Sequence, residues 1–403
     1  MISDELYLEL NDFFISKIRE TNLTYKRYLY DKINWQARMI CIRGSRGTGK
    51  TTMMLQYIKE HYINLGEALY VTLDDIRLQN LTIVDIAEYA HLHGIKALFL
   101  DEVHYIPHWE QMVKNVYDRF STLKVVYTGS SILQLAKSEA DMSRRQTVYD
   151  MTGFSFREYL LFKGIFAAEP MRLEDILKNV THLTTDVFKS FRPIAYFDEY
   201  LKNGYYPFIL EGGQDYYEHL QSIVNVVIFQ DIPLIEKDIS FATLQKARKL
   251  LSLLSKIVPL EPNISTLCRE VEAAREVIIK LLSLLEEAGM LRLLKKEINS
   301  YKQLSRPDKI YLDNTNLMYA MQPTVNKGSM RETFFMNQLS YIADVSMPEK
   351  GDFLVNEHYT FEVGGKDKTF KQIKDIPNSY LAVDDTEIGF GNRIPLWLFG
   401  FLY

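Results

Sequence analysis

Cysteine is scarce in this chain, and its scarcity excludes two kinds of architecture. The 403 residues include two cysteines, Cys41 and Cys268, which lie far apart in the sequence and in apolar surroundings. Such a pair predicts neither a disulfide framework nor a cysteine-based metal site. We expect both to be reduced core residues in a protein of a reducing compartment.

Long hydrophobic runs and an excess of positive charge are absent as well. No apolar stretch approaches the roughly 20 residues that a membrane helix needs, and the acidic, amphipathic start MISDELYLELNDFF is unlike a signal peptide. Forty-seven Lys and Arg against 52 Asp and Glu give a net charge of −5, which excludes a chain that is basic throughout. We therefore expect a cytoplasmic protein with no membrane partner, and a local basic patch for nucleic acid stays open. The length exceeds one ordinary core, so two or three domains are expected.

One glycine-rich stretch matches the phosphate-binding loop pattern G-x-x-x-x-G-K-[ST] at every fixed position. It reads GSRGTGKT over residues 44–51, after an apolar run at 37–42 that predicts a buried strand, and before a helical pattern at 51–61. Strand, glycine-rich loop and helix are the context that the motif requires, whereas an ordinary turn before a helix is the alternative.

The chemistry of this loop follows from its backbone and its last residues. Glycines let successive N–H groups form a nest for phosphate oxygens, and the positive end of the following helix adds to that field. Lys50 would reach the β- and γ-phosphates, and Thr51 would offer its hydroxyl to Mg²⁺. The residues predicted to bind nucleotide here are Gly44, Ser45, Arg46, Gly47, Thr48, Gly49, Lys50, Thr51 and Thr52.

A second motif lies at the end of an apolar run over residues 96–102. This run ends in Asp101 and Glu102, the Walker B pattern, at the strand end where ligand chemistry collects in an open parallel sheet. We expect Asp101 to hold the Mg²⁺ shell and Glu102 to act as general base. An acidic pair that only solvates a loop is the alternative. His104 completes a DEVH string that also occurs in helicases, but no second helicase core follows, and a loop residue or coupling to Glu102 is favoured.

Polar and basic residues farther along supply more candidates. Thr128 and Ser130 end the apolar run at 123–131 and could sense the γ-phosphate or position water, with a plain turn as the alternative. Arg144 and Arg145 could stabilise transition-state charge, in the same chain or from a neighbouring subunit, or could be surface groups. In the lead-in to the first strand, Arg27 and Tyr28 are weaker candidates for the adenine side.

Alternating strand and helix patterns predict an α/β fold with a parallel, doubly wound sheet. Residues 1–36 are expected to be largely helical. The predicted domains are a P-loop ATPase domain over 1–165, a helical region over 166–240, a winged-helix-like domain over 241–322 and a small α/β domain over 323–403. Three helices followed by strands carry the winged-helix prediction, although the third helix is acidic and aliphatic for a DNA reader.

The last region carries acidic residues in a pattern known from nucleases. A helix-borne Glu332, then Asp352, then Glu362 followed by a lysine resembles the restriction-endonuclease-like metal site, in which carboxylates bind Mg²⁺ and the lysine activates water. Here Gly364 occupies the expected lysine position, and Lys366 comes two residues late. We therefore expect a degenerate domain, with an active nuclease as the alternative.

Taken together, GSRGTGKTT, ALFLDEVHYIPHWE, VVYTGSS and MTGFSFREYL resemble a large prokaryotic group of uncharacterised AAA-type ATPases. Members of this group typically carry an ATPase core, a winged-helix region and a restriction-endonuclease-like domain of unknown function. The resemblance implies ATP and Mg²⁺ as ligands and hydrolysis at Gly44–Thr51, Asp101 and Glu102. We expect nucleotide state to move the C-terminal domains on DNA or a partner protein, in a chain that could form homo-oligomers. An ATP-gated DNA nuclease and a slow ATP-dependent signalling switch are the alternatives.

Overall fold

The chain divides into two compact units. The computed structural model describes residues 2–129, 142, 144–212, 214–259, 261–296, 307–322 and 324–403. The first unit is Met1–Thr152 with Asp231–Lys237, and the second is Gly153–Gln230 with Asp238–Tyr403. Among the helices within these ranges, none has the length and apolar character needed to cross a membrane.

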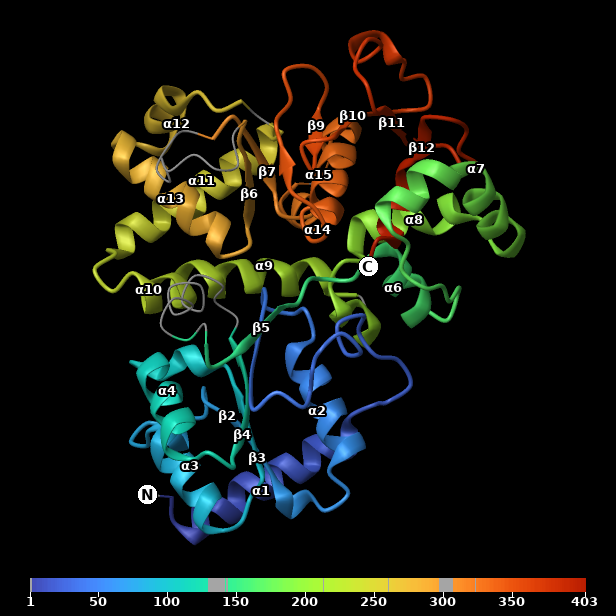
Figure 1. The fold of residues 1–403 in the computed structure, drawn as a ribbon. Helices are drawn as coiled ribbons and strands as arrows, with labels where there is room; N and C mark the ends of the chain where they lie inside the picture. The colour runs from blue at the N-terminus through green and yellow to red at the C-terminus, as the bar shows by residue number, and fades with distance from the viewer. Residues whose placement is uncertain are drawn as a thin grey trace. The chain divides into compact units, whose positions relative to one another are not determined.

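The first unit is an α/β layer structure (Figure 1). Its elements in chain order are α1 (Asp4–Glu20), β1 (Met39–Arg43), α2 (Lys50–His61), η1 (Leu65–Glu67), β2 (Ala68–Thr72), η2 (Ile76–Leu78), α3 (Ile83–Leu92), β3 (Ala97–Asp101), η3 (Val103–Tyr105), α4 (Trp109–Arg119), β4 (Lys124–Gly129), β5 (Thr147–Asp150) and α10 (Ile232–Ile235).

The described strands of this unit form one parallel sheet of order β2-β3-β4-β1-β5. Successive side chains of a strand point to opposite faces, so Leu98 and Leu100 enter the core under α3 and α4, while Phe99 enters the core under α2. Figure 1 shows α3 and α4 on one side of the sheet and α2 on the other. The predicted parallel α/β sheet is therefore confirmed. Its strand order puts β4 between β1 and β3.

Helix boundaries in this unit follow from local chemistry. At the start of α3, the Thr82 and Asp85 side chains and backbone N–H groups form a capping box, and Gly94 lies in the left-handed region at φ 72° just past the helix end. The expectation that residues 1–36 are largely helical is wrong beyond Glu20. Residues 21–38 form turns, because buried side chains such as Arg27 and Tyr30 anchor this stretch individually to the core.

In its described residues, the second unit combines helices with two small sheets. Its elements are α6 (Phe156–Phe162), α7 (Leu173–Ser190), α8 (Pro193–Asn203), η4 (Pro207–Glu211), α9 (Tyr216–Val226), α11 (Phe241–Ile257), α12 (Ile264–Val271), α13 (Arg275–Glu287), β6 (Leu291–Leu294), β7 (Lys309–Leu312), α14 (Thr315–Met321), α15 (Lys327–Leu339), β8 (Val345–Ser346), β9 (Phe353–Val355), β10 (Tyr359–Gly364), η6 (Phe370–Gln372), β11 (Ser379–Val383), β12 (Arg393–Pro395) and η7 (Leu396–Phe401). One turn of π-helix, η5 (Val227–Asp231), ends at the first residue of the segment that belongs to the first unit.

Two groups of elements in this unit come after residue 240. Helices α11, α12 and α13 precede the antiparallel pair β6-β7, in the order that the sequence predicted. The later strands form a mixed sheet of order β12-β11-β10-β9-β8, against which α15 packs at β10 (Figure 1).

The division into two units differs from the expected boundary at residue 165. Residues 153–165 belong to the second unit, because Ser155 Oγ and Arg157 Nε both donate to the carbonyl of Tyr403, at 2.7 and 2.9 Å. These buried bonds tie α6 to the end of the chain. The four-domain division stays a prediction.

Candidate nucleotide-binding site

The glycine-rich loop lies between the end of β1 and the start of α2. A Cβ on Gly44 would lie 2.1 Å from the carbonyl oxygen of Met151, so no larger residue fits without a backbone shift. Gly49 is the N-cap of α2 in the left-handed conformation at φ 91°, which a side chain would disfavour. The Thr48 hydroxyl donates to the Ser45 carbonyl at 2.9 Å, which closes the loop on itself. The glycines are thus required by the loop's shape.

Lys50 lies buried inside this loop. Its Nζ donates to the carbonyls of Gly44 at 2.9 Å and Ser45 at 3.0 Å. Burial lowers the pKa of Lys50, although the charges of Glu102 and Asp101 oppose that shift. The ammonium is therefore held by neutral carbonyls beside two acidic side chains, where negative phosphate oxygens would stabilise its charge.

The Asp101 carboxylate accepts hydrogen bonds from three hydroxyl groups, which lie on α2, β2 and β4. Thr51 Oγ1 on α2 donates to Asp101 Oδ2 at 2.6 Å, and the Tyr70 hydroxyl on β2 donates to the same oxygen at 3.0 Å. Thr128, on the adjacent strand β4, donates to the other oxygen. Burial raises the pKa of Asp101, and the charge of Glu102 adds to that shift. A hydroxyl and a carboxylate held side by side fit Mg²⁺, which prefers hard oxygen ligands.

Glu102 follows in a strained backbone conformation. Its φ of 55° and ψ of 48° are left-handed, which is uncommon for a residue other than glycine and clusters at functional sites. Its N–H donates to Thr128 Oγ1 at 3.1 Å, and its carboxylate Oε2 lies 3.3 Å from His104 Nδ1. Burial lowers the pKa of His104, against the opposing charges of Glu102 and Asp231. The side chain of Glu102 is thus turned toward a buried imidazole.

The structure adds one acidic residue that sequence analysis missed. Arg46 of the loop donates to both oxygens of Asp231, from Nε at 2.8 Å and from Nη2 at 2.9 Å, and Nη2 also donates to the Tyr105 hydroxyl at 2.8 Å. His104 Nε2 lies 4.0 Å from Asp231 Oδ1. Arg46 and Asp231 are 185 positions apart, and the stretch around Asp231 matches no motif, so no sequence signal identified the pair.

Other candidates are placed away from the phosphate loop or engaged in packing. Arg145 donates to Asp118 of α4 at 3.0 and 3.1 Å, and Arg144 is exposed. Arg27 is buried and donates to the carbonyls of Thr48 and Thr152, so it supports the loop's backbone.

The remaining candidates from the sequence are Tyr28, Thr52 and Ser130. The Tyr28 hydroxyl donates to the Asp150 carbonyl at 3.2 Å. Thr52 is exposed on α2, and Ser130 lies outside the described residues. The catalytic or sensing roles predicted for these and the preceding side chains stay predictions.

The acidic residues predicted in the last region lie in the second unit, where most have charged partners. Glu332 on α15 accepts from Lys309 Nζ at 2.6 Å and from the Tyr311 hydroxyl at 3.1 Å. Glu362 on β10 pairs with Lys368 Nζ at 2.5 Å.

Asp352 and Lys366 complete the predicted set. Asp352 accepts from the backbone N–H of Val363 at 2.8 Å. The lysine that pairs with Glu362 is Lys368, which was not among the predicted residues. Over the described ranges, no cluster of three or more His, Cys, Asp or Glu side chains is arranged to hold a metal ion.

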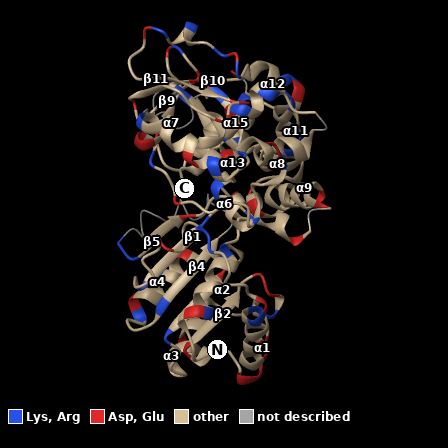
Figure 2. Ribbon diagram, turned by 90° about the vertical axis from the view of Figure 1, so that its right-hand side faces the viewer, with Lys and Arg blue, Asp and Glu red and all other residues tan. Residues whose placement is uncertain are grey.

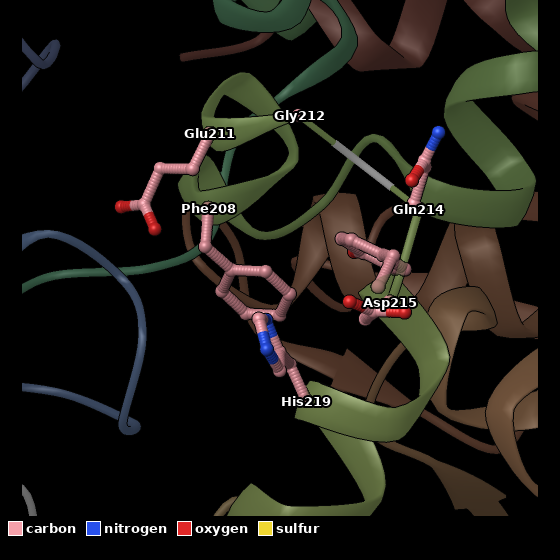
Figure 3. A pocket seen from close by; sticks show the side chains of 7 residues that line it. Phe208, Glu211, Gly212, Gln214, Asp215 and His219 are labelled. Atoms are coloured by element: carbon pink, nitrogen blue, oxygen red, sulfur yellow. The ribbon is translucent and has the colours of Figure 1, made fainter.

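One pocket of the second unit is lined by none of the acidic residues that the sequence predicted. Figure 3 shows the ring of His219 next to that of Phe208, and the two rings meet edge to face with centroids 6.3 Å apart. Its lining is Phe208, Glu211, Gly212, Gln214, Asp215, Tyr216 and His219. Because these side chains are aromatic, polar or acidic and include no lysine or arginine, the pocket does not have the chemistry of a phosphate site.

The fold and the loop together define a class of protein. A parallel sheet with a phosphate-type loop after β1, and with a carboxylate at the end of β3 bonded to the first turn of α2, makes the first unit a P-loop ATPase-like domain. Residues 36–160 match the family described as AAA domain, so this domain is of the AAA type. It is consistent with binding and hydrolysis of ATP.

Two curated proteins of Methanocaldococcus jannaschii are similar over most of the chain. The uncharacterized protein MJ1637 is 30% identical over 320 residues, which are 71% of this chain and 66% of that protein. The uncharacterized protein MJ1544 is 24% identical over 310 residues, which are 74% of this chain and 65% of that protein. The similarity thus spans just under two thirds of the length of each relative.

Solved structures are more distantly similar. The Walker-type ATPase PABY2304 of Pyrococcus abyssi covers 77% of this chain and 95% of its own, with a TM-score of 0.35 and 10% identity. AMPPCP-bound DnaA from Aquifex aeolicus covers 71% of this chain and 89% of its own, with a TM-score of 0.28 and 14% identity. Similarities this distant carry no assignment of substrate or partner.

Proposed function

We propose that this protein hydrolyses ATP with Mg²⁺ at the loop Gly44–Thr51. The observation that carries the proposal is the 2.6 Å hydrogen bond from Thr51 Oγ1 to Asp101 Oδ2, beside the buried ammonium of Lys50. It joins the helix after the loop to the end of β3, which supports the proposed roles of Lys50 as a phosphate ligand and of Thr51 and Asp101 as metal ligands.

The residues divide the work of hydrolysis as follows. The loop N–H groups and Lys50 bind the phosphates and stabilise the charge that spreads over the γ-phosphoryl oxygens. Thr51 and Asp101 would hold Mg²⁺, which supplies charge neutralisation at the β- and γ-phosphates when bound. A water oxygen attacks the γ-phosphorus, the bond from this phosphorus to the bridging oxygen of ADP breaks, and the water proton passes to the Glu102 carboxylate. The products are ADP and inorganic phosphate.

Lys50→Ala tests the assignment. Loss of the buried ammonium should lower ATP turnover by about 10²-fold or more, since one preorganised donor contributes that much in comparable sites. Turnover is measured as phosphate release by the purified full chain, with and without EDTA. Lys59→Ala is the matched control on the same helix, because Lys59 Nζ donates to the carbonyls of Arg19 and Thr21. Unchanged turnover in Lys50→Ala would refute the proposal.

For the rest of the chain we propose an output role. The order α11, α12, α13, β6, β7 supports a winged-helix-like region, and the mixed sheet with α15 supports a nuclease-like but degenerate one. Basic and acidic residues both occur around α12 (Figure 2), for instance the adjacent Arg269 and Glu270, so charge alone favours a protein partner as much as DNA. Limited proteolysis with ATP, with ADP and without nucleotide tests whether nucleotide state changes these regions. An identical cleavage pattern in all three states would refute this output role.

A further inference from the structure

The segment Asp231–Lys237 belongs to the first unit, although it comes about 80 residues after the rest of that unit. It begins with Asp231, a carboxylate that is 3% exposed and receives two hydrogen bonds from Arg46. At this segment the chain enters the first unit, and after Lys237 it returns to the second. The question is why a buried carboxylate lies at the start of the segment that returns to the first unit.

Asp231 faces two titratable side chains of the candidate nucleotide site. Arg46, which it binds, is part of the phosphate loop, and His104, 4.0 Å away, contacts Glu102 on its other ring nitrogen. The hydrogen bonds and charge of Asp231 raise the pKa of Arg46 overall, although burial is the largest influence and acts to lower it. Asp231 therefore compensates a positive charge that would otherwise face the phosphates.

A purely structural ion pair is the alternative. Buried pairs often add little net stability, since desolvation of both groups offsets their attraction. A structural role would not require that Arg46 belong to the phosphate loop, or that the imidazole between Asp231 and Glu102 be buried. Both features are present, and they point to the hydrolysis reaction.

We propose that Asp231 is a positioning residue of the hydrolysis site. It neutralises and orients Arg46 of the phosphate loop and, through His104, orients the carboxylate of Glu102. This inference rests on the proposed ATPase function. It makes hydrolysis depend on a segment that is joined to the second unit at both of its ends, so that the second unit has a route to regulate turnover.

Opposite effects of two single variants test the proposal. In Asp231→Asn the charge of Arg46 is no longer compensated, so we expect nucleotide to bind about threefold tighter or more, while kcat falls at least about tenfold because Glu102 is less well oriented. In Arg46→Met the uncompensated carboxylate of Asp231 repels phosphate, and binding should weaken. The double variant should bind nucleotide close to the wild-type affinity. Affinity is measured with a fluorescent ATP analogue, and kcat by phosphate release.

Two control variants and one measurement distinguish the positioning role of Asp231 from a loss of folding. Asp231→Glu keeps the charge and should restore kcat at least in part. Asp75→Asn removes the carboxylate of another ion pair of the first unit, in which Arg77 Nε lies 3.0 and 3.1 Å from the two Asp75 oxygens, and should leave affinity and kcat unchanged. Thermal unfolding reports whether each variant is folded.

The outcomes decide between a positioning role and a structural one. Opposite shifts in affinity with a fall in kcat support the proposal. Wild-type values in Asp231→Asn, or equal losses of affinity and kcat in both single variants together with a lowered Tm, overturn it. Where Asp231→Asn does not fold, Arg46→Met decides, because unchanged or tighter binding in that variant contradicts the proposal. A wild-type chain that does not hydrolyse ATP refutes the proposed function instead.

Discussion

Among the described residues, the carboxylates of the two predicted metal sites have different kinds of hydrogen-bond partners. In the first unit, Asp101 receives hydroxyl groups from Thr51, Tyr70 and Thr128. In the second unit, Glu332 and Glu362 each receive a lysine ammonium, from Lys309 at 2.6 Å and from Lys368 at 2.5 Å. In the sequence, both groups read as acidic residues of a metal-site pattern.

The difference lies in what happens to the negative charge. A hydroxyl is a neutral hydrogen-bond donor, so a carboxylate that it binds keeps its negative charge and can still bind a cation. A lysine ammonium neutralises the carboxylate charge itself. Burial raises the pKa of Asp101 and of Glu332, so both sites favour an added positive charge. In the second unit that charge is a lysine of the chain itself. A pattern of carboxylates thus indicates a metal site only together with the identity of its neighbours.

The largest effect is expected on ATP turnover. Glu102→Gln should lower kcat by about 10²-fold or more, since positioned general bases contribute about 10²–10⁴-fold, while nucleotide stays bound because the phosphate loop is intact. Phosphate release and binding of a fluorescent ATP analogue measure the two properties.

Glu362→Gln is the matched control for this change. It makes the same substitution in the second unit and should leave turnover unaltered. A comparable loss of turnover in Glu362→Gln would break the comparison, because it would place an essential carboxylate in the second unit.

A smaller effect is expected on metal affinity. In the presence of nucleotide, Asp101→Asn should weaken Mn²⁺ binding about tenfold or more, because a charged ligand beside the Thr51 hydroxyl is replaced by a neutral one. Titration calorimetry with Mn²⁺ measures this. Glu332→Gln should leave Mn²⁺ binding unchanged, and a second Mn²⁺ site that Glu332→Gln abolishes would revive the nuclease alternative.

Local patterns predicted the first unit well, and distant contacts are what the sequence did not reveal. The phosphate loop, its flanking strand and helix, and the acidic end of β3 are each contained in a few consecutive residues, so periodicity and a motif suffice to locate them. Arg46 pairs with Asp231 because the chain returns to the first unit after residue 230. No local sequence pattern predicts this return.

The acidic residues of the second unit show the same limit. Glu332, Asp352 and Glu362 could be chosen from the sequence, but the lysines that pair with Glu332 and Glu362 could not. Lys309, on β7, lies 23 positions before its partner Glu332 on α15, and Lys368 pairs with Glu362 from the loop after β10. Contacts of this kind are set by the packing of α15 and β7 and by the path of the loop, not by spacing along the chain.

The smallest effect concerns stability and its dependence on pH. Lys309→Met removes the cation beside Glu332, whose side chain is 18% exposed, and breaking a largely buried pair in this way costs about 3 kcal/mol. Burial and the charge of Asp352 already raise the pKa of Glu332, and loss of Lys309 raises it further. A carboxyl with a raised folded-state pKa contributes its full stability below the unfolded pKa of about 4.3 and loses it as pH rises through the folded pKa.

The stability deficit of Lys309→Met should therefore be larger at pH 7.5 than at pH 5, which urea unfolding midpoints of the variant and the wild type at both pH values measure. Adding Glu332→Gln removes the titrating charge, so the double variant should lose this pH dependence and recover part of the stability at pH 7.5. A deficit that is equal at both pH values would show that Lys309 acts through packing of its aliphatic chain, and the charge argument for the second unit would then fail. A deficit that grows with pH would instead identify charge neutralisation by lysine as the feature that separates this carboxylate group from the one around Asp101.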